Sequence, residues 1–165
     1  MPDSLAIINR VIEEHQRIRE HVKLVGDSVS DPEALRSLEK VRADWIPGRL
    51  EDVSEKQKRL QQTLSVLGEG LKRHFDFEEK ALPPLLGELL MQSLIIDHRA
   101  IMKEIGEATP VVADTKLEGL NRDELIAKES HIQQMVNNIC QLVEEHTARE
   151  ETILFMVQTA LKEKG

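Results

Sequence analysis

The sequence predicts an all-α fold, an up-down-up-down four-helix bundle formed by one domain over residues 1–165. Apolar residues recur at steps of three and four along four long segments, as in helices that bury one face. Hydrophobic residues make up 40% of the chain and charged residues 32%, with many strong helix formers among them. The chain has no Tyr, three Phe and one Trp, which is poor material for β-structure.

The first long helix is expected to begin at a cap on Ser4 or the residue before it and to end at about Val25. Residues 26–28 read Gly-Asp-Ser and are expected to stop this helix. Residues 31–44 open with Asp-Pro, which suits an N-cap followed by the first helical position. We therefore expect a short extra helix there, between the first and second long helices.

Prolines mark the expected ends of the next two helices. The second long helix is predicted over residues 49–82, where Pro83-Pro84 ends it. The third is predicted over residues 88–108, closed by Thr109-Pro110 and followed by a loop over residues 111–120. Each of these helices carries an apolar stripe with the spacing of one helical face.

The last helix is predicted over residues 121–164, with its first residue, an Asn, as the cap. Its apolar stripe, like the others, is interrupted by polar residues at positions that should face the core. A buried carboxylate without a partner is costly, so these residues would make a poor core unless they bind something. The six residues concerned are His15, His74, Glu78, His98, His146 and Glu150.

Both halves of the chain carry the same pattern. Residues 12–18 and 95–101 each read Ile, two residues, His, two residues, Ile. Residues 74–82 and 146–154 each read His, three residues, Glu-Glu, two residues, Leu. A His and a Glu four residues apart lie about 6 Å apart along one helical face, so both can reach one metal ion. The repeat predicts two helical hairpins related by a pseudo-twofold axis, with the four histidines in one layer.

This arrangement suggests a two-metal centre. Glu78 and Glu150 would bridge the ions, and the four histidines would supply terminal nitrogens, two to each ion. Imidazole and carboxylate without thiolate suit iron or manganese, with a position on each ion left for a small ligand. Acidic residues beside the histidines, Glu14, Asp97 and Glu145, are candidates to orient the imidazole rings.

The His-x-x-x-Glu-Glu repeats, each preceded by a helix-borne His, resemble the hemerythrin family, also called the HHE cation-binding domain. The resemblance covers nearly the whole chain and carries the family's metal ligands onto the same six residues. It implies a hemerythrin-like bundle that holds two iron ions in an oxo- or hydroxo-bridged centre. Such a centre binds O₂ reversibly, or senses O₂, iron or nitric oxide.

The sequence departs from the oxygen-carrying members of the family at two positions. Met102 stands where they have a further His, one turn after the third-helix ligand. Glu150 lies four residues after His146, where the carriers have an Asp spaced five after. The pattern is closer to the six-ligand bacterial and regulatory members. One ion then has two histidines where three are expected, or it recruits another donor such as Glu79.

Other polar and aromatic residues near the motifs are expected to have ordinary roles. Glu79 and Glu151 are predicted to be solvated helix charges. Phe75 is expected in the core, and of the three phenylalanines it is the best placed to line an O₂ pocket. His21 is expected at the surface, and His131 lies too far along its helix to share the site.

The leading functional prediction is a cytoplasmic protein that binds O₂ or another diatomic ligand for sensing, storage or delivery. The alternative is a di-iron enzyme that handles peroxide or nitric oxide or repairs iron centres. Ferritin-like chemistry is disfavoured, because those sites use Glu-x-x-His and this chain has His-x-x-x-Glu. The absence of Tyr also removes a tyrosyl-radical role.

The net charge of −8 argues against nucleic acid or an anionic membrane as a partner. No apolar run is long enough to span a bilayer, and the one Cys suits a reducing cytoplasm. The second and last helices are expected to extend beyond the other two. A second subunit in a homodimer, or the connecting segments, would then cover their apolar residues Val53, Leu60, Leu64, Leu125, Ile132 and Val136.

Overall fold

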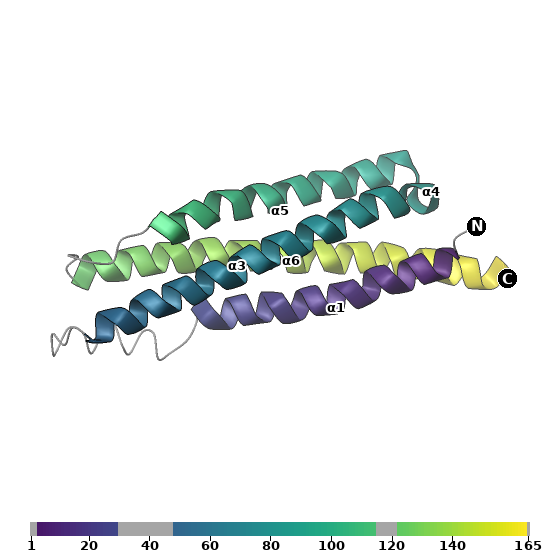
Figure 1. Ribbon diagram of the computed structural model, residues 1–165. Coiled ribbons are helices and arrows are strands. Elements are labelled where there is room, and N and C mark those ends of the chain that lie inside the picture. Colours follow the sequence, from purple (N-terminus) through teal and green to yellow (C-terminus); the bar gives the residue numbers. More distant parts are fainter. Residues whose placement is uncertain (1–2, 30–47, 115–121, 165) are drawn as a thin grey trace.

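The computed structural model describes residues 3–29, 48–114 and 122–164 of the chain. The described residues form four long helices that run alternately up and down, and Figure 1 shows them packed as one elongated bundle. Each long helix packs against two of the others, because α1 and α5 both contact α3 and α6. The predicted all-α bundle is therefore confirmed. The helices are α1 (Ser4–Val29), α3 (Gly48–Ala81), the short α4 (Pro83–Leu86), α5 (Glu88–Asp114) and α6 (Arg122–Lys164).

The first long helix starts where predicted but does not stop at Gly26. The backbone N–H of Leu5 donates to the carboxylate of Asp3 at 3.1 Å, so Asp3 caps α1. Glycine ends a helix by taking a positive φ, and of the described glycines Gly87 alone does so. Gly26 keeps a helical backbone, the fully buried Val25 before it belongs to the core, and α1 continues to Val29.

The third long helix also runs past its predicted end, because α5 continues through Pro110 to Asp114. A proline inside a helix costs about 3 kcal/mol. The buried side chains on either side offset this cost, since Ala108 and Val112 are both fully enclosed in the core. The Val112 carbonyl also accepts a hydrogen bond of 2.6 Å from the Gln57 amide. The prediction that Thr109-Pro110 closes this helix is therefore wrong.

The prolines after the second long helix do end it, as predicted, but they also begin a new element. Helix α3 ends at Ala81, and α4 follows with proline in its first turn. Gly87, with a φ of 84°, reverses the chain between α4 and α5. The side chain of Leu82 at this corner is fully buried, which anchors the turn to the bundle. This short helix was not predicted.

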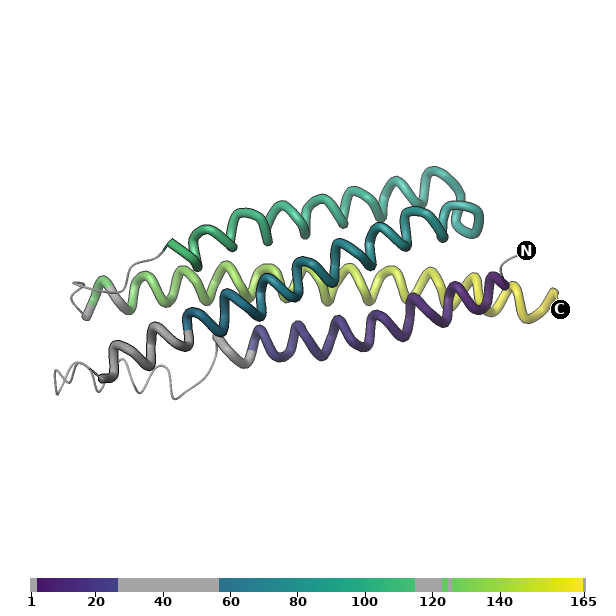
Figure 2. Tube along the Cα trace, in the orientation of Figure 1, coloured from purple at the N-terminus to yellow at the C-terminus, as the bar shows by residue number. Residues whose placement is uncertain are grey.

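The interior holds two apolar clusters with polar residues between them. The larger cluster includes Ile18, Leu71, Ile101 and Val143. It extends toward the first residues of α3 and the last residues of α5. The smaller cluster lies toward the chain termini, which Figure 2 shows at the same end of the bundle. Its buried members are Ile8, Val11, Leu82, Met91, Leu94 and Leu154.

Four of the apolar residues expected to need a second subunit are covered within the chain. Leu60, Leu64, Ile132 and Val136 are buried in the larger cluster. They are covered because α1 and α5 are longer than predicted and pack beside them. These four residues therefore give no reason to invoke a dimer. The side chains of Val53 and Leu125 lie outside the described residues.

The loop predicted over residues 111–120 is helical in its first part, because α5 includes residues 111–114. Its residues 115–120, the Asn121 cap and the predicted short helix over residues 31–44 fall outside the described residues. Helix α6 reaches Lys164, as predicted. None of the described helices contains a stretch both long and apolar enough to cross a bilayer.

Two glycines in α3 give a matched pair for testing this packing. A methyl group added at Gly70 meets nothing within 4 Å, whereas one added at Gly68 meets Ile105 Cγ2 at 3.2 Å. Alanine is favoured over glycine inside a helix by about 1 kcal/mol. We expect Gly70→Ala to raise the free energy of unfolding by about that amount. Gly68→Ala should raise the free energy of unfolding by less, since Ile105 must move to make room for the added methyl group. If urea denaturation showed the same increase for both variants, this close contact between α3 and α5 would be contradicted.

Candidate metal centre

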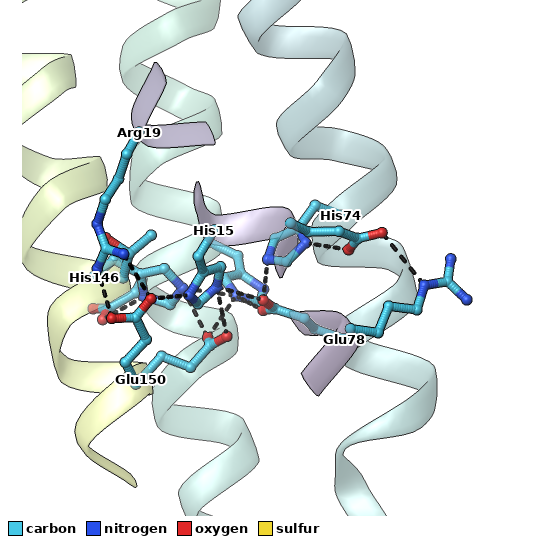
Figure 3. A network of polar contacts seen from close by, with 12 residues as sticks. His15, Arg19, His74, Glu78, His146 and Glu150 are labelled. Carbon is cyan, nitrogen blue, oxygen red and sulfur yellow. Dashed lines mark hydrogen bonds and ion pairs between the residues drawn. The ribbon is translucent and has the colours of Figure 1, made fainter. Parts of the chain in front are cut away.

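The six polar residues predicted to face the core lie together in one layer across the bundle. Each replaces an apolar residue on its helix stripe, so the same burial that forms the bundle carries it inward. None is more than 5% exposed to solvent. In Figure 3 the side chains of His15, His74, Glu78, His146 and Glu150 converge between the helices. Helix α1 provides His15, α3 provides His74 and Glu78, α5 provides His98, and α6 provides His146 and Glu150.

The Glu78 carboxylate lies between histidines of three helices. Its Oε1 is 3.2 Å from His15 Nε2 and also contacts His74 Nε2. Its Oε2 is 3.0 Å from His98 Nε2. The carboxylate therefore points one oxygen at each half of the layer.

The Glu150 carboxylate does the same from the other side. Its Oε1 is 3.2 Å from His15 Nε2, and its Oε2 is 3.0 Å from His146 Nε2 and 3.8 Å from His98 Nε2. The Nε2 atoms of His98 and His146 are themselves only 3.1 Å apart. Both carboxylates thus span two histidine pairs, His15 with His74 and His98 with His146.

Within the described part of the chain these donor atoms form two groups that share both carboxylates. The atoms of each group lie within 4.8 Å of one another. One group is His15, His74, Glu78 and Glu150, and the other is Glu78, His98, His146 and Glu150. The two glutamates that the sequence analysis expected to bridge a pair of ions are thus common to both groups.

The chemistry of the layer fits a pair of metal ions. Five of its buried polar atoms have no hydrogen-bond partner among the described residues, which is unfavourable in a protein interior. Four of the five face the middle of the layer, where an ion would meet them. Nitrogen and oxygen donors without sulfur suit iron or manganese. The atoms are His74 Nε2, Glu78 Oε2, His98 Nδ1 and both carboxylate oxygens of Glu150.

The electrostatics of the layer also favour positive charge between the carboxylates. Burial lowers the pKa of His15 and His98, but contacts with Glu150 and Glu78 outweigh it and raise both to about 9. Burial raises the pKa of Glu78 and Glu150, yet their histidine contacts bring both below the ordinary value. The site therefore holds protons that a bound cation would displace.

A second ring of acidic residues stands behind the histidines. The Nδ1 atom of His74 lies 2.7 Å from Glu14 Oε2, and that of His146 lies 3.1 Å from Asp97 Oδ2. Glu14 and Asp97 therefore contact imidazole rings, as predicted. The rings belong to histidines of neighbouring helices and not to the histidines that stand beside these acids in the sequence. Glu145 does not take part, because its exposed carboxylate instead accepts a hydrogen bond of 3.0 Å from Gln141.

Glu151 was predicted to be a solvated charge, and this is wrong. Its side chain is only 13% exposed and its Oε1 lies 3.3 Å from His15 Nδ1. Arg19 holds the same carboxylate with two contacts of 2.8 and 2.7 Å. Burial raises the pKa of Glu151, but the Arg19 contact outweighs it and lowers the pKa overall. The sequence signal was the doubled glutamate, whose second member points across to α1.

Glu79 occupies the corresponding place in the other half, behind His98. Its Oε1 is 3.9 Å from His98 Nδ1, on the side of the ring away from the layer's centre. Glu79 belongs to neither group of donor atoms. The alternative in which it serves as an additional metal ligand therefore has no support in this geometry. Met102 is half-buried against the larger apolar cluster.

Phe75 is buried, as predicted, and packs directly on the site. Its ring stacks on that of His98 with centroids 3.9 Å apart and an interplanar angle of 10°. It also meets the His146 ring edge-on at 5.7 Å. Phe75 thus packs against the histidine pair of His98 and His146. It is not among the residues that line the surface groove described next. His131 is exposed and stands apart from the layer, as predicted.

The groove, of about 400 Å³, lies between α1 and α3 and reaches the layer at His74. Its rim carries positive charge, although the chain as a whole has a net charge of −8. His21, predicted at the surface, is half-buried in its wall. The other lining residues include Arg10, Glu14, Arg17, Leu67, Gly70 and Arg73.

A four-helix bundle with a buried layer of histidines and shared carboxylates defines a class of metal-binding helical protein. The hemerythrin HHE cation binding domain matches residues 6–157, a span that includes all six residues of the layer. The chain belongs to this family, and binding of a metal cation follows from that membership. Comparisons with curated proteins and with solved structures give no match.

The pKa shifts predict how the stability of the metal-free protein depends on pH. Histidines whose pKa rises from 6.5 to about 9 on folding stabilise the fold fully below pH 6.5. That contribution, on the order of 3 kcal/mol for each histidine taken separately, is lost as the pH rises toward 9. The lowered pKa values of Glu78 and Glu150 have the opposite effect. They stabilise the fold above pH 4.5, and this contribution is lost as the pH falls below that value.

We therefore expect urea denaturation of the metal-free protein to show its highest stability between pH 4.5 and 6.5. His131→Gln is the control, since that side chain is exposed and outside the site. The variant should keep the same profile. A stability that stays flat from pH 6.5 to 9 would contradict the proposed charge balance of the layer.

Proposed function

We propose that this chain is a non-haem di-iron protein that binds O₂ or another small diatomic ligand for sensing, storage or delivery. The observation that carries the proposal is the sharing of Glu78 and Glu150 by two histidine pairs. Family membership supports cation binding, and the sulfur-free donor set supports iron, with manganese as the other candidate.

In this proposal each group of donor atoms would hold one ion through its two histidines and the two shared carboxylates. His15 and His74 would hold one ion, and His98 and His146 would hold the other. Four protein donors are fewer than the six that octahedral iron takes, so each ion keeps room for solvent and a small ligand. A bound di-iron pair supplies reversible redox chemistry, and the chain supplies its donors and its enclosure.

The enclosure favours a small ligand. Apolar clusters flank the layer on both sides, and Phe75 covers one histidine pair. The groove between α1 and α3 is lined by one residue of the layer, His74. We therefore assign the groove as the approach for the external ligand.

The first test is metal loading. We expect the anaerobic protein to take up two Fe(II) ions per chain and to develop the absorption of an oxidised di-iron centre on exposure to air. Glu150→Gln should lower the uptake below two ions, because it removes a carboxylate charge that both groups share. Glu145→Gln is the matched control, since this glutamate is exposed and accepts a hydrogen bond from Gln141 outside the layer.

Uptake that is the same in both variants, or air exposure without a di-iron spectrum, would contradict the proposal. Reversible formation and loss of the O₂-exposed spectrum would support ligand binding. Catalytic consumption of peroxide or nitric oxide would identify the enzyme alternative.

The second test concerns the groove. Gly70 lines it, and a side chain added there meets nothing within 4 Å. Gly70→Leu should therefore fill the groove and slow the stopped-flow reaction of the reduced di-iron protein with O₂ at least several-fold, without changing its iron content. Gly106→Leu on α5 is the control, because it also adds a side chain in open space but outside the groove. Equal rates for the two variants would exclude the groove as the approach.

A further inference from the structure

The two halves of the metal centre are related by the internal repeat, but they differ behind the histidines. His15 and His98 occupy corresponding places in the repeat, as do the glutamates Glu151 and Glu79. Four residues after His15 stands Arg19, and four residues after His98 stands Met102. One half thus has a cation where the other has a thioether.

In the half that contains Arg19, the outer glutamate is held firmly. The Arg19 guanidinium donates to both carboxylate oxygens of Glu151, at 2.8 and 2.7 Å. This bidentate geometry leaves Glu151 Oε1 at 3.3 Å from His15 Nδ1. His15 therefore has an oriented acceptor for its outer ring nitrogen.

In the half that contains Met102, the outer glutamate is not held. A methionine side chain has no hydrogen-bond donor, so it cannot anchor a carboxylate. The Glu79 side chain is 33% exposed, and its Oε1 lies 3.9 Å from His98 Nδ1, beyond hydrogen-bond distance. His98 Nδ1 is buried and has no hydrogen-bond partner in the part of the chain that the structure describes.

The other two histidines do not share this difference. His74 Nδ1 is backed by Glu14 at 2.7 Å, and His146 Nδ1 is backed by Asp97 at 3.1 Å. Each of these acids is in turn paired with an arginine, Arg10 at 3.4 Å and Arg149 at 2.8 Å. Three of the four histidines therefore have a fixed outer partner, and His98 is the exception.

The outer partner matters because it sets the strength of a histidine ligand. An acceptor on the outer nitrogen fixes the tautomer, orients the ring and makes the inner nitrogen more basic. Loss of such a partner typically lowers metal affinity 10- to 100-fold. Phe75 stacks on His98 and restricts its ring plane, but an aromatic face cannot accept the outer proton as a carboxylate does.

We infer that the ion held by His98 and His146 is the weaker-bound and more readily exchanged of the two. The inequality arises because Met102 offers no donor that could anchor Glu79 behind His98. Arg19 and Glu151 are the positioning residues of the other half. The inference rests on the proposed two-ion centre and adds the order in which its two positions bind their ions. The His15 and His74 position fills first, and the His98 and His146 position fills last.

Anaerobic titration with Co(II), a redox-stable stand-in for Fe(II), tests this order against a chromophoric chelator. We expect wild-type protein to bind two Co(II) ions with dissociation constants at least about 10-fold apart. Met102→Arg should bring the two dissociation constants closer together, because it should strengthen Co(II) binding at the weaker position. Arg19→Met should also bring the two dissociation constants closer together, because it should weaken Co(II) binding at the stronger position. Glu151 then loses its two hydrogen bonds from Arg19.

Met102→Leu is the matched control, because it keeps an apolar side chain of similar size without a donor. It should leave the gap between the two dissociation constants unchanged. A gap that closes equally in Met102→Leu and Met102→Arg would overturn the inference, since packing and not the anchor would then be responsible. Two equal dissociation constants in the wild type would also overturn it.

Proton NMR of the Co(II)-loaded protein provides a second readout that does not depend on affinity. Ligand histidines give strongly shifted Nδ1–H signals, which exchange slowly with D₂O when an acceptor holds the proton. We expect three slow signals in the wild type and a fourth in Met102→Arg. Four slow signals in the wild type would contradict the inference. Binding of fewer than two Co(II) ions would instead contradict the two-ion centre itself.

Discussion

The structure depends on the burial of two carboxylates among four imidazoles in the middle of an apolar bundle. Charged groups in such a place are tolerated only when they are paired or bind a cation. Glu78 and Glu150 satisfy this condition by each facing histidines from both halves of the layer. The apolar clusters on either side then keep water from screening these contacts, which makes the layer a strong attractor for positive charge.

The outer residues extend this alternation of charge to the surface. From the centre outward, a carboxylate is followed by a histidine, a second carboxylate and an arginine, as in Glu150, His15, Glu151 and Arg19. In this series every contact joins α6 to α1, so the same contacts hold these two helices together and position the donors. The chain therefore does not separate residues for stability from residues for metal binding.

The sequence was sufficient to predict the bundle and the six inner residues, because both follow from helical periodicity and the internal repeat. It was insufficient for helix ends and for the outer ring. Gly26 and Pro110 are strong local stop signals, yet burial in the core, decided by distant residues, carried both helices through them. Glu151 lies beside the inward stripe, and only the position of α1 turns it from a solvated charge into a partner of His15.

The polar layer also restricts how the helices can assemble. Sliding α6 by one turn, about 5.4 Å, would push His146 and Glu150 into an apolar cluster and leave Glu78 with fewer partners. The apolar stripes alone repeat along each helix and would tolerate such a slip far better. In the folded structure the layer therefore favours one alignment of the four helices over an alignment slipped by one turn.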